Sequence, residues 1–304
     1  MTQPLVSVCI GSYNREKYIR ETLDSVFAQT YPNLEVIVVD DASTDRTVEI
    51  VQSYGERVRL IRRETNSGMC PVTRNQAVRA ATGDYVALLD SDDGWYPAKI
   101  QRQVAFLESH REIPLCHTYC HIMDENSHVT GIRHEGNLPP TGNLFKKLLR
   151  HCFITISSVM VRRNIFDEVG WFIEDPRYGI WGEDLEFFLR VAKKYPMGLV
   201  DGNEVLARYR RYPQNISGGN WKCTPESVPL HRMMIDRPDI WKGAVPRNEV
   251  VEAFVETSLE NCQYWQDRGF SDRARFFAAD ALKFAPVKFQ LWKLLLKSLI
   301  GTHG

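Results

Sequence analysis

The chain has 304 residues, of which 43% are apolar, so it is long enough for one large α/β domain with an appended region. Lysine and arginine together number 38, as do aspartate and glutamate, and this zero net charge argues against a nucleic-acid-binding surface, which carries a basic excess. The seven cysteines are an odd number, so we expect them to be reduced thiols. Residues 1–4 do not begin a signal peptide, and no apolar stretch is long enough to span a membrane, so we expect the protein to stay in the cytoplasm.

The first hundred residues alternate between short apolar runs, typical of buried strands, and segments with apolar residues at helical spacing. Strands are predicted over 5–10, 34–39, 58–61 and 85–89, and helices over 19–27, 47–54, 72–81 and from 97 onward. This order predicts a mostly parallel sheet with helices on both faces.

Later segments are mixed and then become helical. Strands are predicted over 115–122, 157–161 and 204–212, and helices over 143–150 and 183–195. From about residue 225 glycine is scarce and helical periodicity continues to 299. We therefore expect an α/β domain over 1–220 and a helical region over 221–304.

Polar clusters follow three of the predicted strands, at residues 11–14, 40–41 and 90–93. Open α/β sheets bind ligands beyond the carboxyl ends of their strands. If the strands pair in parallel, the three clusters face one crevice.

The segment Asp90-Ser91-Asp92-Asp93 carries three carboxylates within four residues. Such charges repel one another unless a cation or hydrogen-bond donors lie between them. Mg²⁺ or Mn²⁺ takes oxygen ligands from one or two carboxylates and from substrate phosphates, so Asp92 is a candidate metal ligand and Asp90 a candidate partner of a ribose hydroxyl. The alternative is a simple turn.

Other candidates lie at the ends of elements. The acidic pair 40–41 would accept an N–H from a nucleotide base or cap the next helix. Arg74 begins a helix, where a cation is unfavourable, so a ligand or a carboxylate partner is predicted, with a surface arginine as the alternative. Glu183 and Asp184 would supply a general base for an acceptor hydroxyl or would only complement a helix dipole. Trp181 would stack on a sugar or be buried.

Taken in order, these segments resemble glycosyltransferase family 2, whose members are inverting enzymes with the GT-A fold. The resemblance covers about residues 1–217. It rests on the text of residues 6–14, 38–45, 66–68, 74–75, 83–86, 90–93 and 181–184.

The resemblance implies metal-dependent transfer of a sugar from a nucleotide diphosphate, with UDP favoured, to a glycan or lipid-linked acceptor in the synthesis of cell-surface polysaccharide or lipopolysaccharide. The implied roles are the base site for Ser12, Tyr13, Asp41 and Arg74, the ribose for Asp90, Mn²⁺ or Mg²⁺ for Asp92, the catalytic base for Asp184, and substrate contact for Glu183 and Trp181. Tyr212 stands where relatives often have a histidine that helps to hold the metal or diphosphate. The identity of the third protein ligand of the metal is therefore left open, and Arg210 or Arg211 would steady the diphosphate instead.

Segment 287–300 is strongly apolar with interspersed Lys288, Lys293 and Lys297. Such a helix would lie on an anionic membrane surface at the inner face of the cell membrane, pack on the catalytic domain, or join two copies of the chain.

Two rival functions remain open. A sugar-nucleotide nucleotidyltransferase would need a glycine-rich basic loop after the first strand, where 11–15 has a single glycine. A non-catalytic nucleotide-sugar-binding protein would not need both Asp92 and Asp184.

Overall fold

The computed structural model describes residues 3–133, 141–176, 182–200, 204–212, 228–286, 288, 290 and 292–294. The chain divides into two compact units. The first comprises Met1–Leu144, Phe153–Glu174 and Glu183–Tyr212, and the second comprises Phe145–Cys152, Asp175–Gly182 and Pro213–Gly304.

A seven-stranded sheet, in the order β10-β6-β9-β4-β1-β2-β3, forms the centre of the first unit. Its strands are β1 (Val6–Ser12), β2 (Leu34–Asp40), β3 (Arg59–Arg62), β4 (Tyr85–Asp90), β6 (Leu115–His117), β9 (Met160–Arg162) and β10 (Met197–Leu199). Strand β1 pairs in parallel with β2 and β4, whereas β9 runs antiparallel between β4 and β6. The mostly parallel sheet predicted from the sequence is confirmed.

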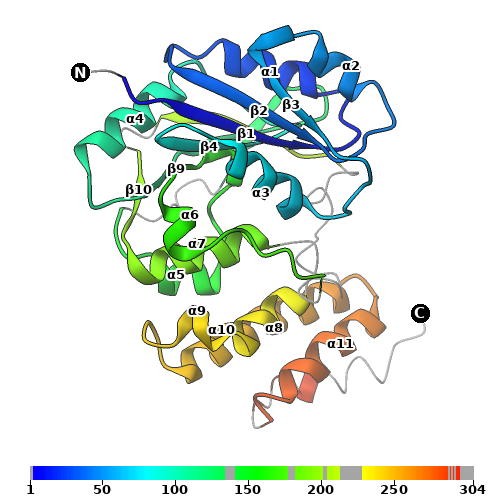
Figure 1. Cartoon of the computed structure of the whole chain (residues 1–304). Helices are drawn as coiled ribbons and strands as arrows, with labels where there is room; N and C mark the ends of the chain where they lie inside the picture. The colour runs from blue at the N-terminus through cyan, green and yellow to red at the C-terminus, as the bar shows by residue number, and fades with distance from the viewer. Residues whose placement is uncertain are drawn as a thin grey trace. The chain divides into compact units, whose positions relative to one another are not determined.

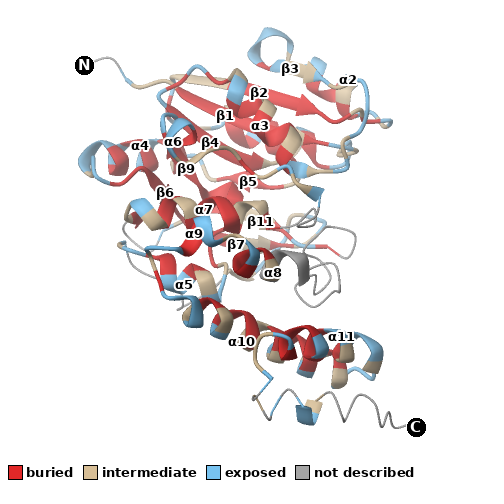
Figure 2. Cartoon of the chain, turned by 60° about the horizontal axis from the view of Figure 1, so that its bottom comes forward, coloured by how far each residue is buried: buried red, intermediate tan, exposed pale blue. Residues whose placement is uncertain are grey.

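Helices cover both faces of this sheet (Figure 1). The helices α1 (Ile19–Phe27), α2 (Thr47–Gln52) and α4 (Lys99–Ser109) share one apolar core with the strands, and α3 (Cys70–Ala80), α6 (Ile165–Val169) and α7 (Glu183–Lys194) lie on the opposite side. The central strands are buried along most of their length (Figure 2). Strands covered on both faces are apolar at most positions, which is why simple apolar runs predict them.

A second sheet of four strands lies beside the first, in the order β5-β11-β7-β8. Its strands are β5 (Gly94–Trp95), β7 (Tyr119–Met123), β8 (Val129–Ile132) and β11 (Val205–Arg210). The single strand predicted over 115–122 is wrong, because the chain leaves the central sheet after His117 and joins the second sheet at Tyr119. Both halves alternate in the same way, so the pattern does not reveal the change of sheet at Thr118.

The second unit is helical, as the sequence predicts for the C-terminal region. It contains α5 (Phe145–Arg150), α8 (Val228–Asp236), α9 (Pro238–Trp241), α10 (Arg247–Gln266) and α11 (Ser271–Leu282). Helix α5 is joined to α10 by an ion pair of 2.9 Å between Lys146 and Glu249. Helices α10 and α11 enclose a small core of Cys262, Trp265, Ala274, Phe277 and Ala278. Two short 3₁₀ turns, η1 (Gly55–Arg57) and η2 (Ile156–Ser158), complete the described elements.

Candidate active site

The carboxyl ends of β1, β2 and β4 meet at one edge of the central sheet. Ser12 is in register with Asp40, and Gly11 with Asp90. The polar clusters predicted to face one crevice therefore lie side by side, where sheets of this kind bind ligands.

The loops after β1 and β2 are bonded to each other. The Asn14 N–H donates to Ser43 Oγ at 2.9 Å, and the Thr44 N–H donates to Asn14 Oδ1 at 2.9 Å. Tyr13, which follows β1 directly, is 42% exposed. The Ser12 hydroxyl is buried and has no hydrogen-bond partner among the residues that the structure describes.

Asp41 already has protein partners. Its carboxylate accepts the Ser67 N–H at 3.0 Å and the Ser67 hydroxyl at 2.7 Å, and lies 2.8 Å from Arg63 Nε. Asp40 does not cap α2 as the alternative expected, because its Oδ2 accepts the Ser43 N–H at 3.0 Å in the loop before that helix. Asp41 thus fixes the loop that leads into α3.

Arg74 connects three elements. Helix α3 packs closely on β1, since any side chain at Gly11 would collide with Thr73. The buried Arg74 guanidinium lies with Nη2 at 3.1 Å from Asp90 Oδ1, and its Nη1 donates to Glu183. The end of β4 and the start of α7 are therefore held together through a single arginine.

Asp184 lies directly beside this bridge. Its Oδ1 accepts the N–H of Leu185 at 2.7 Å. Burial raises the pKa of Asp184 to about 6, the negative charge of Glu183 adds to the rise, and Arg74 opposes it. A carboxylate with this pKa takes up and releases protons close to neutral pH, as a general base must.

Asp90 ends β4, Asp92 follows it in the next loop, and the two side chains differ in exposure. The Asp90 side chain is 39% exposed, whereas that of Asp92 is 14% exposed. The Tyr212 hydroxyl donates to Asp92 Oδ2 at 2.9 Å, and Arg15 Nε lies 3.5 Å from the same oxygen. Burial raises the pKa of Asp92; Arg15 opposes the rise and Asp90 adds to it. Tyr212, the departure from the family pattern, thus contacts the candidate metal ligand directly.

Sequence reasoning missed Arg15 and the role of Asp93. Arg15 could have been suspected, because it is the cation that directly follows the polar cluster 11–14. Asp93 is turned inward, where its carboxylate accepts the Arg210 N–H at 2.7 Å and the Ser157 hydroxyl. Trp181 lies outside the described residues.

The donor set suits a hard divalent ion in part. Within the described ranges no group of three His, Cys, Asp or Glu side chains is arranged to hold a metal. Two carboxylates in one loop, Asp90 and Asp92, are nonetheless what Mg²⁺ or Mn²⁺ commonly takes from a protein when substrate phosphates and water complete the shell. The residues fit an ion that binds together with a diphosphate.

Comparison with known proteins identifies the family. Residues 7–170 match the model of Glycosyl transferase family 2. TuaG of Bacillus subtilis, a putative teichuronic acid biosynthesis glycosyltransferase, is 34% identical over 238 residues, which cover 76% of this chain and 88% of that protein. WfaP of Escherichia coli, a UDP-Glc:alpha-D-GlcNAc-diphosphoundecaprenol beta-1,3-glucosyltransferase, is 30% identical over 220 residues, covering 72% and 82%.

The fold has a counterpart among solved structures. The crystal structure of Staphylococcus aureus TarS in complex with UDP-GlcNAc matches with a TM-score of 0.70 and 20% identity, over 98% of this chain and 89% of that one. The shared architecture is the GT-A fold that the sequence predicts. This chain is a glycosyltransferase that belongs to glycosyl transferase family 2.

Proposed function

We propose that the enzyme transfers a sugar from a UDP-linked donor to an acceptor hydroxyl in one displacement that inverts the anomeric carbon. The observation that carries this proposal is the bridge from Arg74 to Asp90 and Glu183. It holds the carboxylate of Asp90, the proposed partner of the donor ribose, beside the acidic start of α7. UDP is favoured because TarS was solved with UDP-GlcNAc and WfaP is named for UDP-Glc.

The nucleotide would occupy the edge formed by β1, β2 and β4. The exposed ring of Tyr13 offers a face for the base, and the Ser12 hydroxyl can bond to it. Asp90, whose carboxylate is partly exposed, would bind the ribose hydroxyls. Arg74 and Asp41 would complete the site, Asp41 through the Ser67 loop that it fixes.

Asp184 is the proposed catalytic base. Arg74 forms its ion pair with Glu183 rather than with Asp184, and burial together with the negative charge of Glu183 keeps the pKa of Asp184 raised. An ionised Asp184 would take the proton of the acceptor hydroxyl as it attacks the sugar on the face opposite the leaving diphosphate. Glu183 and Trp181 would contact the sugar.

Asp92, with Asp90 beside it, would hold Mn²⁺ or Mg²⁺. When bound, such an ion stabilises the negative charge that the leaving nucleoside diphosphate gains. Tyr212 fixes one oxygen of Asp92, and Arg15 brings a positive charge to the same place.

The acceptor would be a glycan or a lipid-linked sugar of a cell-surface polysaccharide. TuaG is named for teichuronic acid, and WfaP for a sugar on diphosphoundecaprenol. Teichuronic acid and the lipid-linked sugar both carry sugar hydroxyls, the group that a carboxylate base can activate.

Asp184→Asn tests the assignment. The variant should lose UDP release from UDP-glucose or UDP-GlcNAc, with a GlcNAc-diphosphate lipid as acceptor, by about 100-fold or more, because an amide cannot accept the proton. Its affinity for UDP, measured by calorimetry, should change little. Asp272→Asn, at an exposed site in the second unit, is the control. Wild-type turnover by Asp184→Asn would refute the role.

Asp92→Asn separates the metal from the base. Its affinity for UDP should fall in the presence of Mn²⁺ and match that of the wild type without the ion, since the variant removes a metal ligand and leaves the base site intact. Unchanged affinity with Mn²⁺ present would contradict the role of Asp92.

A further inference from the structure

Strand β11 ends in a buried arginine that the reaction proposed above does not use. Arg210 has a side chain only 1% exposed, and its Nη2 lies 2.6 Å from Glu21 Oε2 on α1. A buried cation is costly unless its donors are paired, so the partners of Arg210 indicate what it is there to hold.

Arg210 grips the loop that carries Asp90 and Asp92. Its Nε donates to the carbonyl oxygen of Asp92 at 2.7 Å, and its own N–H donates to Asp93 Oδ1 at 2.7 Å. From the other side, the Thr22 hydroxyl donates to the carbonyl oxygen of Asp93 at 2.7 Å. The loop is therefore fixed by β11 and by α1 together.

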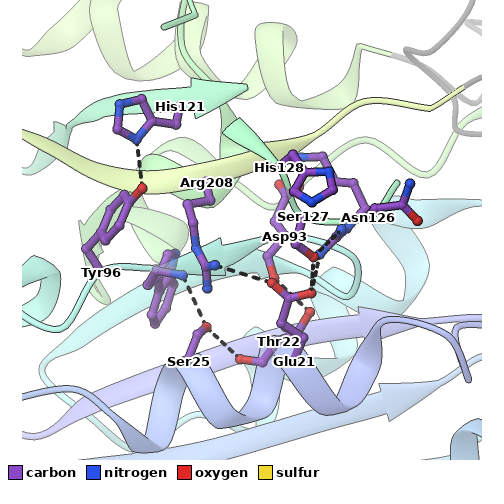
Figure 3. A network of polar contacts seen from close by, with 12 residues as sticks. Glu21, Thr22, Ser25, Asp93, Tyr96, His121, Asn126, Ser127, His128 and Arg208 are labelled. Carbon is purple, nitrogen blue, oxygen red and sulfur yellow. Dashed lines mark hydrogen bonds and ion pairs between the residues drawn. The ribbon is translucent and has the colours of Figure 1, made fainter. Parts of the chain in front are cut away.

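A third segment closes the network. The Nη1 of Arg210 donates to the carbonyl oxygen of Asp124 at 3.1 Å and to Ser127 Oγ at 2.9 Å, both in the turn between β7 and β8. Ser127 donates in turn to Glu21 at 2.7 Å. Figure 3 shows Glu21 and Thr22 on α1 facing Ser127 and Asp93.

We propose that Arg210 is a positioning residue, which sets the backbone of the Asp90–Asp93 loop so that Asp92 presents its carboxylate to the divalent ion that would bind with the donor diphosphate. This inference rests on the proposed function of that loop. The same strand also fixes the carboxylate itself, since Tyr212 follows two residues later and bonds to Asp92 Oδ2. Direct contact of Arg210 with the diphosphate, one of the roles considered from the sequence, is wrong, because Nε and both Nη atoms are engaged with protein oxygens inside the fold.

The chemistry of the network requires arginine. A guanidinium offers five donors in a planar fork, whereas a lysine ammonium is a single point of charge on a flexible stem. Lysine at 210 would keep the charge pair with Glu21 but would not reach the Asp92 carbonyl and the Asp124 turn together. Arg210→Lys is therefore a sharper variant than removal of the side chain.

Arg208 provides a matched control on the same strand. It also pairs with Glu21, at 3.3 Å, but is 22% exposed. Its guanidinium lies over Gly94, where a Cβ atom would come within 2.8 Å of Nη2. Arg208→Lys keeps the charge beside Glu21 and leaves the Arg210 bonds to the loop in place.

The test follows the conformation of the loop through Trp95 and then measures the binding of UDP. Trp95 follows the loop directly, and its indole N–H donates to the carbonyl oxygen of Ser157, whose hydroxyl bonds to Asp93. In protein labelled with 5-fluorotryptophan, Arg210→Lys should shift or broaden the fluorine resonance of Trp95, assigned with Trp95→Phe. Arg208→Lys, which keeps the Arg210 bonds to the loop, should change this resonance less than Arg210→Lys does.

Calorimetry then measures the consequence. With Mn²⁺ present, Arg210→Lys should bind UDP about 10- to 100-fold more weakly, which is the usual effect of losing a group that orients a metal-binding residue. Arg208→Lys should match the wild type. Without Mn²⁺, UDP affinity should be the same in all three proteins, which a general loss of structure would not produce.

An unchanged Trp95 resonance or an unchanged affinity with Mn²⁺ in Arg210→Lys would overturn the proposal. If wild-type protein binds no UDP, the proposed function fails, whereas the Trp95 resonance still tests the hold on the loop. Should Arg210→Lys not fold, Glu21→Gln removes the charge partner with little change of shape, and a wild-type resonance and affinity in that variant would overturn the inference.

Discussion

Glu183 and Asp184 are adjacent carboxylates in different surroundings. Arg74 pairs with Glu183, and Asp184 lies partly buried beside that pair with a pKa raised to about 6. Below its pKa an aspartate is protonated and cannot accept a proton. We therefore expect kcat/KM for UDP release to fall as the pH drops through about 6 and to level off above about pH 7.

Arg74 offers a check on the cause of this pH dependence. Its positive charge lowers the pKa of Asp184 against burial and the charge of Glu183. In Arg74→Gln the acid limb of the pH profile should move to higher pH, whatever the remaining activity. A flat wild-type profile between about pH 5 and 8, or a limb that does not move in Arg74→Gln, would contradict the assignment of Asp184.

How far the site could be predicted depends on where each residue lies. Asp90 ends a strand, so the sequence could place it at one edge of a parallel sheet. Glu183 begins a helix, and its place near the substrate was implied only by the resemblance. The partners of Asp41 and Asp92 could not be predicted, because they come from loops whose paths depend on tertiary contacts: Ser67 for the first and Tyr212 for the second.

The elements were predictable to different degrees for a physical reason. Strands β1, β2 and β4 are covered on both faces and appear as apolar runs. The second sheet was not predicted as a sheet, because β5 has only two residues and β7 continues the alternation of β6. Its existence depends on pairing between segments distant in the chain, which a local pattern does not record.

Helix α4 carries a buried lysine, Lys99, from which the pH dependence of the protein's stability can be predicted. Lys99 Nζ donates to Gln103 Oε1 at 2.7 Å, one turn along the helix, and lies 4.0 Å from the ring centre of Trp95. Burial lowers the pKa of Lys99 to about 7. In the unfolded chain the same group titrates near 10.4, so between these values the unfolded state binds more protons and stability rises with pH.

Lys99→Met removes this titration. At about pH 6.5 the variant should be more stable to urea than the wild type, because it no longer buries a charge. From about pH 7 to 9 the free energy of unfolding of the wild type should rise relative to that of the variant, by up to about 1.4 kcal/mol per pH unit. Parallel stability curves of the two proteins over this range would show that Lys99 keeps an ordinary pKa in the fold.

At the scale of the whole molecule, the second unit raises the question of where the enzyme works. No helix of the described chain is long and apolar enough to cross a membrane. The described part of this unit exposes Phe270, Phe276 and Trp292. Most of segment 287–300 lies outside the described residues, but Lys288 and Lys293 are among them. Aromatic side chains with interspersed lysines are typical of segments that lie on anionic membranes.

A lipid-linked acceptor, as proposed above, would make such contact useful, so we predict that the protein floats with phosphatidylglycerol vesicles. The triple variant Lys288→Glu, Lys293→Glu and Lys297→Glu should lose most of this binding, since each lysine near an anionic surface contributes about 1 kcal/mol. Pure phosphatidylcholine vesicles and Lys242→Glu, an exposed charge elsewhere in the unit, are the controls. Equal flotation of wild type and triple variant would end the membrane proposal, and a shift in sedimentation velocity between them would instead assign the segment to contact between copies of the chain.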